Sequence, residues 1–203
     1  MIAGVPYDAE VEYLESTGTQ WIDTGVVPTI YTGTSLVFQT LITTGDESNA
    51  FFGSRLGALN SALSAMQGYY TSLRIRWDYG ANLGWAAGIE SGVHSIITSG
   101  NKLKYDGYSE AVVGGFSPSG MAIWLFAINN NGSALVPHKG LRVFAFQIYD
   151  GNTLVRDFIP VRVGTVGYMY DRVSRKLFGN KGTGAFTIGP DVAKPVMGVW
   201  RYA

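Results

Sequence analysis

Residues 68–88, "GYYTSLRIRWDYGANLGWAAG", bring several aromatic rings and two arginines into one short stretch. An exposed Trp or Tyr ring can stack on the apolar face of a sugar while its polar tip stays hydrated, and an arginine can donate paired hydrogen bonds. The stretch therefore predicts a glycan-binding surface. Tyr79 and Trp85 are its best exposed candidates because they flank a Gly-Ala-Asn loop. The alternative for each ring is a place in the hydrophobic core. The candidate ligand-binding residues are Tyr69, Tyr70, Arg74, Arg76, Trp77, Tyr79 and Trp85.

The run "DAEVEYLE" near the N-terminus holds the densest group of carboxylates in the chain. Asp8, Glu10 and Glu12 have a spacing of two, which places all three on one face of a strand. Glycoside hydrolysis needs two carboxylates that face each other across a cleft, and this geometry would allow it. A solvated edge strand, whose acidic residues oppose aggregation, accounts for the run better. We expect no catalytic residues and no enzymatic activity.

Metal-dependent and nucleophilic chemistry find little support. The chain has no cysteine, and its two histidines, His94 and His138, lie far apart, so neither a zinc site nor cysteine catalysis is expected. A Ser-His-Asp triad stays open, although no nucleophile elbow surrounds a serine. The Gly-rich "GNKGTG" at residues 179–184 lacks the Gly-Lys-Ser/Thr ending of a phosphate-binding loop and fits a turn between strands.

The elements that carry these residues are predicted to be strands. The 27 glycines, with Asn and Asp, interrupt β-branched and aromatic runs about every ten residues, which is typical of a sandwich or barrel. In residues 73–79, Leu73, Ile75 and Trp77 would face one side and the intervening charged residues the other. A short amphipathic helix at residues 55–70 is the alternative for that segment. We expect one domain over residues 1–203, with residues 189–203 as a tail or interface segment.

The composition and net charge of the chain argue against nucleic-acid and membrane partners. With 46% hydrophobic and 15% charged residues, the 203-residue chain can build a core and is not a disordered polymer. Lys+Arg and Asp+Glu both number 15, so a nucleic-acid partner is not expected. No apolar run approaches the length of a membrane span, and the N-terminal residues do not read as a secretory signal. A neutral chain lacks charge repulsion, which favours a homo-oligomer or packing in an assembly.

The stretch "QIYDGNTLVRDFIPVR", residues 147–162, predicts a hairpin. Asp150 and Gly151 suit a type I′ turn, and the following strand places Arg156 and Asp157 on opposite faces. If Asp157 is buried it needs backbone donors or a cation, for which Arg162 and Arg142 are the candidates. Pro160 lacks an N–H and is expected at an edge or bulge, where the strand leaves the ladder.

Three motifs resemble a known family. They are "VEYLESTGTQWIDTG" (residues 11–25), "AFFGSR" (residues 50–55) and the run from "LRVFAFQIYDGNTLVRDFIPVR" to "GYMYDRVSRKLFGNKGTGAF" (residues 141–186). They are similar to the concanavalin A-like, LamG-type jelly-roll domains of gut bacterial and phage proteins. The resemblance implies an all-β fold of two antiparallel sheets, with at most one short helix. It also implies that calcium could bind at the rim, but the loop residues Asp46, Asp106, Asp150 and Asn152 fit turn-forming roles better, and no cofactor is expected.

The resemblance implies binding far more often than catalysis. We expect a non-catalytic, lectin-like component of a phage virion, in capsid decoration or a tail, which packs on virion proteins and contacts host or mucosal glycans. The alternative is a bacterial cell-surface adhesin or carbohydrate-binding module, and a glycoside hydrolase is the least favoured hypothesis. Fold-level analogy gives only a starting expectation for function.

Overall fold

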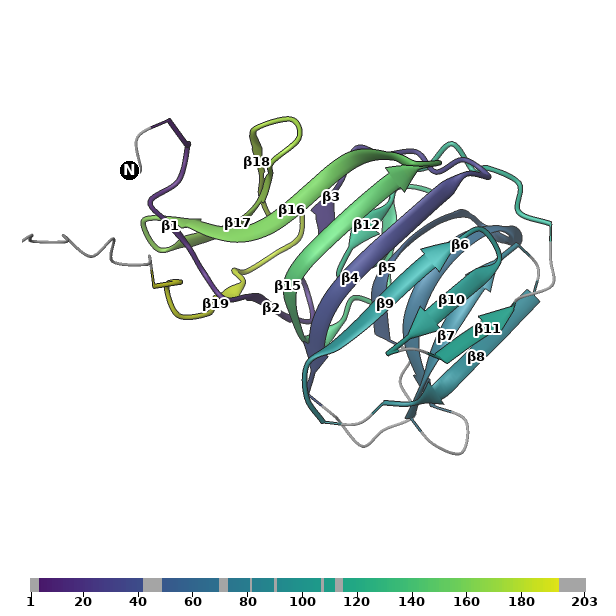
Figure 1. Ribbon diagram of the computed structural model, residues 1–203. Coiled ribbons are helices and arrows are strands. Elements are labelled where there is room, and N and C mark those ends of the chain that lie inside the picture. The colour runs from purple at the N-terminus through teal and green to yellow at the C-terminus, as the bar shows by residue number, and fades with distance from the viewer. Residues whose placement is uncertain are drawn as a thin grey trace, which may run out of the picture.

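Two β-sheets pack face to face in this computed structural model (Figure 1). It describes residues 4–41, 49–69, 73–80, 82–89, 91–106, 108–111 and 115–193, leaving out the side chains of residues 58–60, 68–69, 73, 82–88 and 108–111. The described residues form strands and no helix, and the strand pairs are antiparallel except for β13 with β5. The chain is therefore an all-β jelly-roll sandwich, as predicted. Residues 58–69 belong to a strand, so the helical alternative for that segment is wrong.

The larger sheet is built from strands of the N-terminal, central and C-terminal parts of the chain. In spatial order it contains β11 (Tyr108–Ala111), β10 (Lys102–Tyr105), β9 (His94–Ser99), β4 (Thr32–Thr40), β15 (Lys139–Asp150), β16 (Thr153–Val163), β17 (Val166–Asp171) and β18 (Lys176–Phe178). Three short strands attach to it beside β15 and β16, namely β1 (Ala9–Glu10), β2 (Leu14–Thr17) and β19 (Thr187–Ile188). Figure 1 shows these short strands gathered at one end with β17 and β18.

The smaller sheet carries the aromatic stretch. Its order is β14 (Ser133–Leu135), β13 (Ile128–Asn130), β5 (Asn49–Leu56), β6 (Ala58–Tyr69), β7 (Leu73–Tyr79) and β8 (Asn82–Gly88). Two further strands, β3 (Ile22–Asp23) and β12 (Trp124–Leu125), pair with each other, and β12 also pairs with β5. The described part of the chain contains no helix with the length and hydropathy that a membrane crossing requires.

The core lies between the sheets and is rich in aromatic rings. Phe52 of the smaller sheet packs against Phe146 of the larger sheet at 5.1 Å between ring centroids, and against Trp77 at 6.4 Å. Both phenylalanines are fully buried. Burying one such side chain contributes about 1.5–3 kcal/mol, so the alternating apolar residues of β4, β5, β7 and β15 supply the main driving force for the two-layer arrangement.

The β15–β16 hairpin differs in detail from its prediction. Asp150 pairs with Thr153, which makes Gly151 and Asn152 the two central turn residues. Only Gly151 has a positive φ, of 58°, as the first central position of a type II′ turn requires. The expected type I′ turn centred on Asp-Gly is therefore wrong, because the register is shifted by one residue.

Asp157 is held by a cation that the sequence did not single out. Its Oδ2 accepts a hydrogen bond from Arg172 Nε at 2.8 Å, and its Oδ1 accepts one from Gln147 Nε2 at 3.0 Å. The two candidates named from the sequence pair elsewhere, Arg142 with Glu15 and Arg162 with Asp191. Register explains the difference, because Phe158 pairs with Asp171, so the β17 turn brings Arg172 against Asp157.

We expect Asp157→Ala to lower stability modestly. The carboxylate is 13% exposed and its partner Arg172 is 54% exposed, so solvent screens the pair and the loss in the free energy of unfolding should be about 1–2 kcal/mol. Urea denaturation measures it. Glu12→Ala, at an exposed acidic position, is the control and should change stability by less than about 0.5 kcal/mol. Equal stability of the Asp157 variant and the wild type would contradict a structural role.

Pro160 lies where strand β16 changes partners. The last β15–β16 pair at that end is Phe146 with Phe158, and the β1–β16 pairing begins at Val161 with Glu10. The Pro160 carbonyl accepts a hydrogen bond from Val11 N at 3.0 Å on the same side. On its other side Pro160 pairs with Met169 of β17, so β16 is an interior strand and the expected edge or bulge is not observed. A residue without an N–H is tolerated because the ladder changes partner from β15 to β1 at this position.

Candidate functional site

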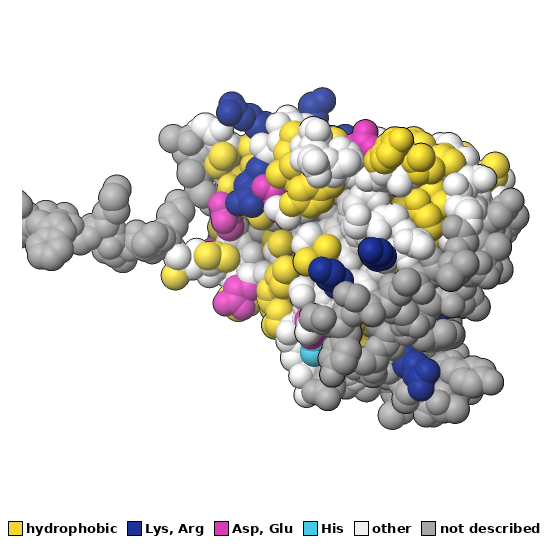
Figure 2. Space-filling model, turned by 45° about the vertical axis from the view of Figure 1, so that its right-hand side comes forward, with side chains coloured by type: hydrophobic (Ala, Val, Ile, Leu, Met, Phe, Trp, Pro, Cys, Tyr) yellow, Lys and Arg dark blue, Asp and Glu magenta, His cyan; other side chains and the backbone are white. Residues whose placement is uncertain are grey.

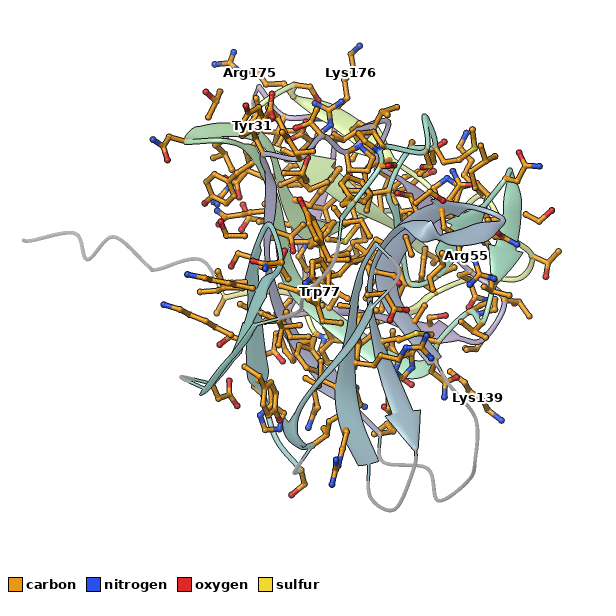
Figure 3. The ribbon with its side chains drawn as sticks, turned by 90° about the vertical axis from the view of Figure 1, so that its right-hand side faces the viewer. Tyr31, Arg55, Trp77, Lys139, Arg175 and Lys176 are labelled. Carbon is orange, nitrogen blue, oxygen red and sulfur yellow. The ribbon has the colours of Figure 1, made fainter. Side chains whose placement is uncertain are left out.

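The aromatic stretch is divided between the two faces of strand β7. Trp77 is 2% exposed and lies inside the sandwich (Figure 3). Tyr79 is 7% exposed and belongs to the same core cluster. The Tyr79 ring packs on Phe116 at 5.0 Å, and its hydroxyl donates to the carbonyl of Ile30 at 3.2 Å. The expectation that Tyr79 is an exposed stacking ring is therefore wrong. Strand alternation turns both rings inward, which leaves neither available to a surface ligand.

The charged residues of β7 lie on the opposite face. Arg76 Nε donates to Asp78 Oδ1 at 2.9 Å, and Ser64 Oγ donates to Asp78 Oδ2 at 3.4 Å. Asp78 is 2% exposed, and burial raises its pKa against the opposing effect of Arg76. Arg76 thus neutralises a buried carboxylate, and Arg74 lies on the same face. Of the other candidates, Tyr70 lies outside the described residues, as do the side chains of Tyr69 and Trp85.

The groups considered for catalysis and metal binding serve local structure. Asp8 accepts a hydrogen bond from Gly164 N at 2.7 Å, and Glu10 accepts one from the hydroxyl of Tyr7 at 3.0 Å. His94 Nδ1 lies 2.5 Å from Asp106 Oδ2. No group of three or more His, Cys, Asp or Glu side chains placed to hold a metal ion occurs in the described ranges, and Asp46 lies outside them.

A cavity of about 300 Å³ opens between the segment after β3 and the loop after β18. Its lining residues come from two motifs that lie about 150 positions apart in the chain, "QWIDTG" and "KLFGNKG". It combines a carboxylate, an ammonium group, one aromatic ring and two glycines, which let a ligand approach the backbone closely. The lining residues are Asp23, Gly25, Leu177, Phe178, Gly179 and Lys181. We call this the end pocket.

Hydrogen bonds between the two motifs hold the segments that line the end pocket together. Lys181 N donates to Trp21 O at 2.9 Å, and Trp21 N donates to Asn180 Oδ1 at 3.3 Å. Gly182 packs so tightly that a Cβ would collide with the carbonyl of Thr19 and the ring of Trp21. Only glycine fits there. The loop that carries Lys181 is thus fixed to the strand that carries Asp23 before any ligand arrives.

Asp23 is oriented by the turn that follows it. Its Oδ1 accepts a hydrogen bond from Gly25 N at 2.9 Å, and Gly25 has a φ of 68°, a conformation that favours glycine. The other carboxylate oxygen has no protein partner among the described residues. Asp23 can therefore accept a ligand hydrogen bond without giving up the bond that holds its turn.

Phe178 forms the apolar side of the end pocket and is supported from behind. Its ring meets Phe158 edge-on at 5.1 Å, and the Arg156 guanidinium lies 5.7 Å from its centroid. Arg156 Nε also donates to the carbonyl of Thr24 at 3.1 Å and lies 3.6 Å from Asp171 Oδ2. Arg156, one of the two charged residues in the apolar run of residues 147–162, therefore contacts both motifs of the end pocket.

Comparison with known proteins gives a limited result. No family model matches the chain, and no curated protein matches it either. Among solved structures it is similar to the "Ruminococcus gnavus IT-sialidase CBM40". The identity is 16%, the match covers 68% of this chain and 90% of that chain, and the TM-score is 0.48. At these values the similarity carries no argument about a ligand.

Sequence reasoning missed the end pocket although it quoted both motifs. The pattern of "QWIDTG" predicts a strand, of which only Ile22–Asp23 is strand in the structure, and "GNKGTG" was assigned to a turn, which agrees with its irregular backbone. The signal that could have found the site was that each segment places glycine and a charged residue next to an aromatic residue, Asp23 with Trp21 in the first and Lys181 with Phe178 in the second. Termini that meet in a sandwich would have brought the two segments together.

Proposed function

We propose that this protein is a non-catalytic, lectin-like β-sandwich that holds one sugar residue of a glycan in the end pocket. The observation that carries the proposal is the chemistry of the lining. Asp23 accepts and Lys181 donates hydrogen bonds, while Phe178 offers a partly exposed ring. A sugar presents hydroxyl groups that need both kinds of partner and an apolar C–H face that stacks on an aromatic ring.

The size and composition of the end pocket agree with this ligand class. A volume of about 300 Å³ lies at the lower end of the range for small-molecule sites and suits a single sugar ring better than a larger cofactor. Asp23 is the only carboxylate among the lining residues, whereas most glycosidases use two carboxyl groups across the bond they cleave. The lining therefore favours binding without hydrolysis.

The biological setting stays a prediction that rests on the sequence resemblance. We propose a phage virion component, in capsid decoration or a tail, with a bacterial surface adhesin as the alternative. Mass spectrometry of purified particles tests the first setting. Finding the protein only in the envelope fraction of a bacterium would favour the second.

We expect Asp23→Asn and Lys181→Ala each to weaken glycan binding at least tenfold. A lost charge-assisted hydrogen bond costs about 1.5–3 kcal/mol, and both side chains should be replaceable without unfolding. Asn keeps the oxygen that accepts from Gly25 N, and the Lys181 side chain is exposed. A glycan array identifies the ligand, and isothermal titration calorimetry measures the affinities.

The matched control is Lys104→Ala, which removes an exposed lysine of β10 on another part of the larger sheet. It should bind glycan as the wild type does. The proposed function is wrong if no glycan binds at millimolar protein, or if the two pocket variants bind as tightly as the control.

A further inference from the structure

An exposed tyrosine lies at the far end of the loop that leaves the end pocket. Gly25 lines the pocket, and residues 26–31 continue from it to β4 along the upper edge of the molecule (Figure 1). Tyr31 is 69% exposed, and Val27 and Ile30 in the same loop are 47% and 51% exposed. Figure 2 shows hydrophobic side chains exposed along this edge, and Figure 3 shows Tyr31 there, pointing away from the core.

Hydrogen bonds hold the loop in one shape. Within it, Thr29 N donates to Thr32 Oγ1 at 2.8 Å and Tyr31 N donates to Thr29 Oγ1 at 3.1 Å. Across to the β15–β16 hairpin, Gly151 N donates to Tyr31 O at 3.0 Å and Thr29 Oγ1 donates to Asp150 Oδ1 at 2.9 Å.

A contact from the opposite sheet adds to this rigidity. The hydroxyl of the buried Tyr79 donates to the carbonyl of Ile30 at 3.2 Å. The backbone under Tyr31 is thus fixed from both layers of the sandwich. A ring presented on a rigid backbone binds at a low cost in conformational entropy, which is a property of recognition surfaces.

The groups around Tyr31 suit a sugar better than an apolar protein surface. The neighbouring hairpin tip is formed by Asp150, Gly151 and Asn152, all of them exposed. One carboxylate oxygen of Asp150 and the amide of Asn152 have no partner among the described residues. Planar acceptors and donors beside an exposed aromatic ring can bind sugar hydroxyl groups while the ring takes the C–H face.

We infer that Tyr31, with Asp150 and Asn152, forms a second glycan subsite, so that the protein binds an oligosaccharide rather than a single sugar. The inference rests on the proposed function of the end pocket. Tyr31 follows Gly25 by six residues, so the Cα atoms of these two residues are at most about 20 Å apart. The glycan would enter the end pocket with one end and follow the loop to Tyr31.

The test is the dependence of affinity on glycan length. The probes are neutral mono- to hexasaccharide ladders of β1,4-linked glucose, N-acetylglucosamine and galactose, together with the best glycan on the array. We expect the wild type to bind the longer members at least tenfold more tightly than the monosaccharide. Tyr31→Ala should lose this gain and keep the affinity for the monosaccharide. Tyr31→Phe should keep both, since the ring supplies the stacking face.

The controls separate this inference from the proposed function. Val93→Ala removes another exposed apolar side chain, 57% exposed, and should leave the length dependence intact. Asp23→Asn should weaken every member of a ladder. If the monosaccharide binds as tightly as its hexamer, or the gain persists in Tyr31→Ala, the second subsite is wrong and the end pocket stands. If no glycan binds, both proposals fail. If Tyr31→Ala abolishes binding of a protein partner and leaves glycan binding unchanged, the loop is a protein-docking surface and the second subsite is wrong.

Discussion

Replacing Asp171 with alanine should lower the free energy of unfolding by about 3–5 kcal/mol, the range found when one partner of a buried ion pair is removed. Asp171 is fully buried at the end of β17. Its carboxylate accepts hydrogen bonds from the backbone N–H groups of Asp157, Val173 and Ser174 at 2.9–3.1 Å, and Arg156 lies 3.6 Å away.

The expected loss of stability is large because the substitution would leave several hydrogen-bonding and charged groups without their partner. Burial alone would raise the pKa of Asp171, but the Ser174 hydroxyl and the hydrogen bonds from these N–H groups together outweigh it and lower the pKa, so the group stays ionised at neutral pH. Alanine would leave three partly buried N–H donors without their acceptor and Arg156 without its nearby carboxylate. The turn that carries Arg172 and the packing behind Phe178 depend on the same residue.

Urea denaturation and thermal melting measure the loss, which should correspond to a fall in the melting temperature of roughly 10 °C. Asp191→Ala is the matched control. Asp191 forms a two-bond ion pair with Arg162 at 2.6 Å, but the carboxylate is 50% exposed, so solvent screens the pair and its loss should lower stability far less than the loss of Asp171. Equal effects of the two substitutions would contradict the assignment of Asp171 as the organising residue of this turn.

Acidification from pH 7 to pH 4 should destabilise the protein through His138. The imidazole is 1% exposed and packs on Phe51 at 5.3 Å between ring centroids. Its Nδ1 lies 3.1 Å from the carbonyl of Lys139, and Nε2 is buried without a hydrogen-bond partner among the described residues. Burial lowers the pKa of His138 from 6.5 to about 4, because a charged ring would lose its hydration there.

The sign of the effect follows from this shift. Between the unfolded pKa of 6.5 and the folded pKa of about 4, the unfolded chain binds a proton that the folded chain does not. Stability is therefore complete above about pH 6.5 and falls as the pH drops toward 4. At about 1.4 kcal/mol per pKa unit, this one group accounts for a loss of about 3 kcal/mol.

The measurement is a series of urea denaturation curves between pH 4 and pH 7. His138→Gln cannot titrate in this range, and its stability should fall by about 3 kcal/mol less than that of the wild type. His94→Gln should keep the fall that His138 causes. Carboxylates with a lowered pKa, such as Asp106 and Asp171, also lose stabilising interactions when they are protonated. That loss occurs mainly at lower pH, so it does not account for a fall in stability between pH 6.5 and pH 4. A wild type that is equally stable at pH 4 and pH 7 would contradict the burial of a neutral His138.

Each of the two proposed subsites is held in place by its own set of hydrogen bonds. The end pocket relies on backbone pairing between Trp21 and the loop of Lys181, and the Tyr31 loop relies on hydrogen bonds to the β15–β16 hairpin. Arg156 and Asp171 support the first, and Tyr79 supports the second. Several side chains that stood out in the sequence thus act by positioning other residues, whereas Asp23, Lys181 and Tyr31 are the residues proposed to contact the ligand.

The sequence by itself was enough for the fold class. Turn residues about every ten positions and the alternation of Leu73, Ile75 and Trp77 with charged residues predicted an all-β sandwich, since side-chain direction in a strand depends only on residue parity. The expectation that Pro160 interrupts the ladder followed from its missing N–H, which is also a local property, but β16 is an interior strand rather than the expected edge. These predictions needed no knowledge of which strands are neighbours.

Only the tertiary structure decided which residues meet. The face of β7 that turns inward depends on the other sheet, and so Tyr79 is buried while Tyr31 is exposed. Asp157 pairs with Arg172 because of the β16–β17 register. Asp23 and Lys181 line the same pocket because the loop after β18 pairs with the segment before β3. Alternation fixes the direction of a side chain within its strand, but strand order and register place it beside residues that are distant in the chain. A binding site built from such residues therefore cannot be assigned from either segment alone.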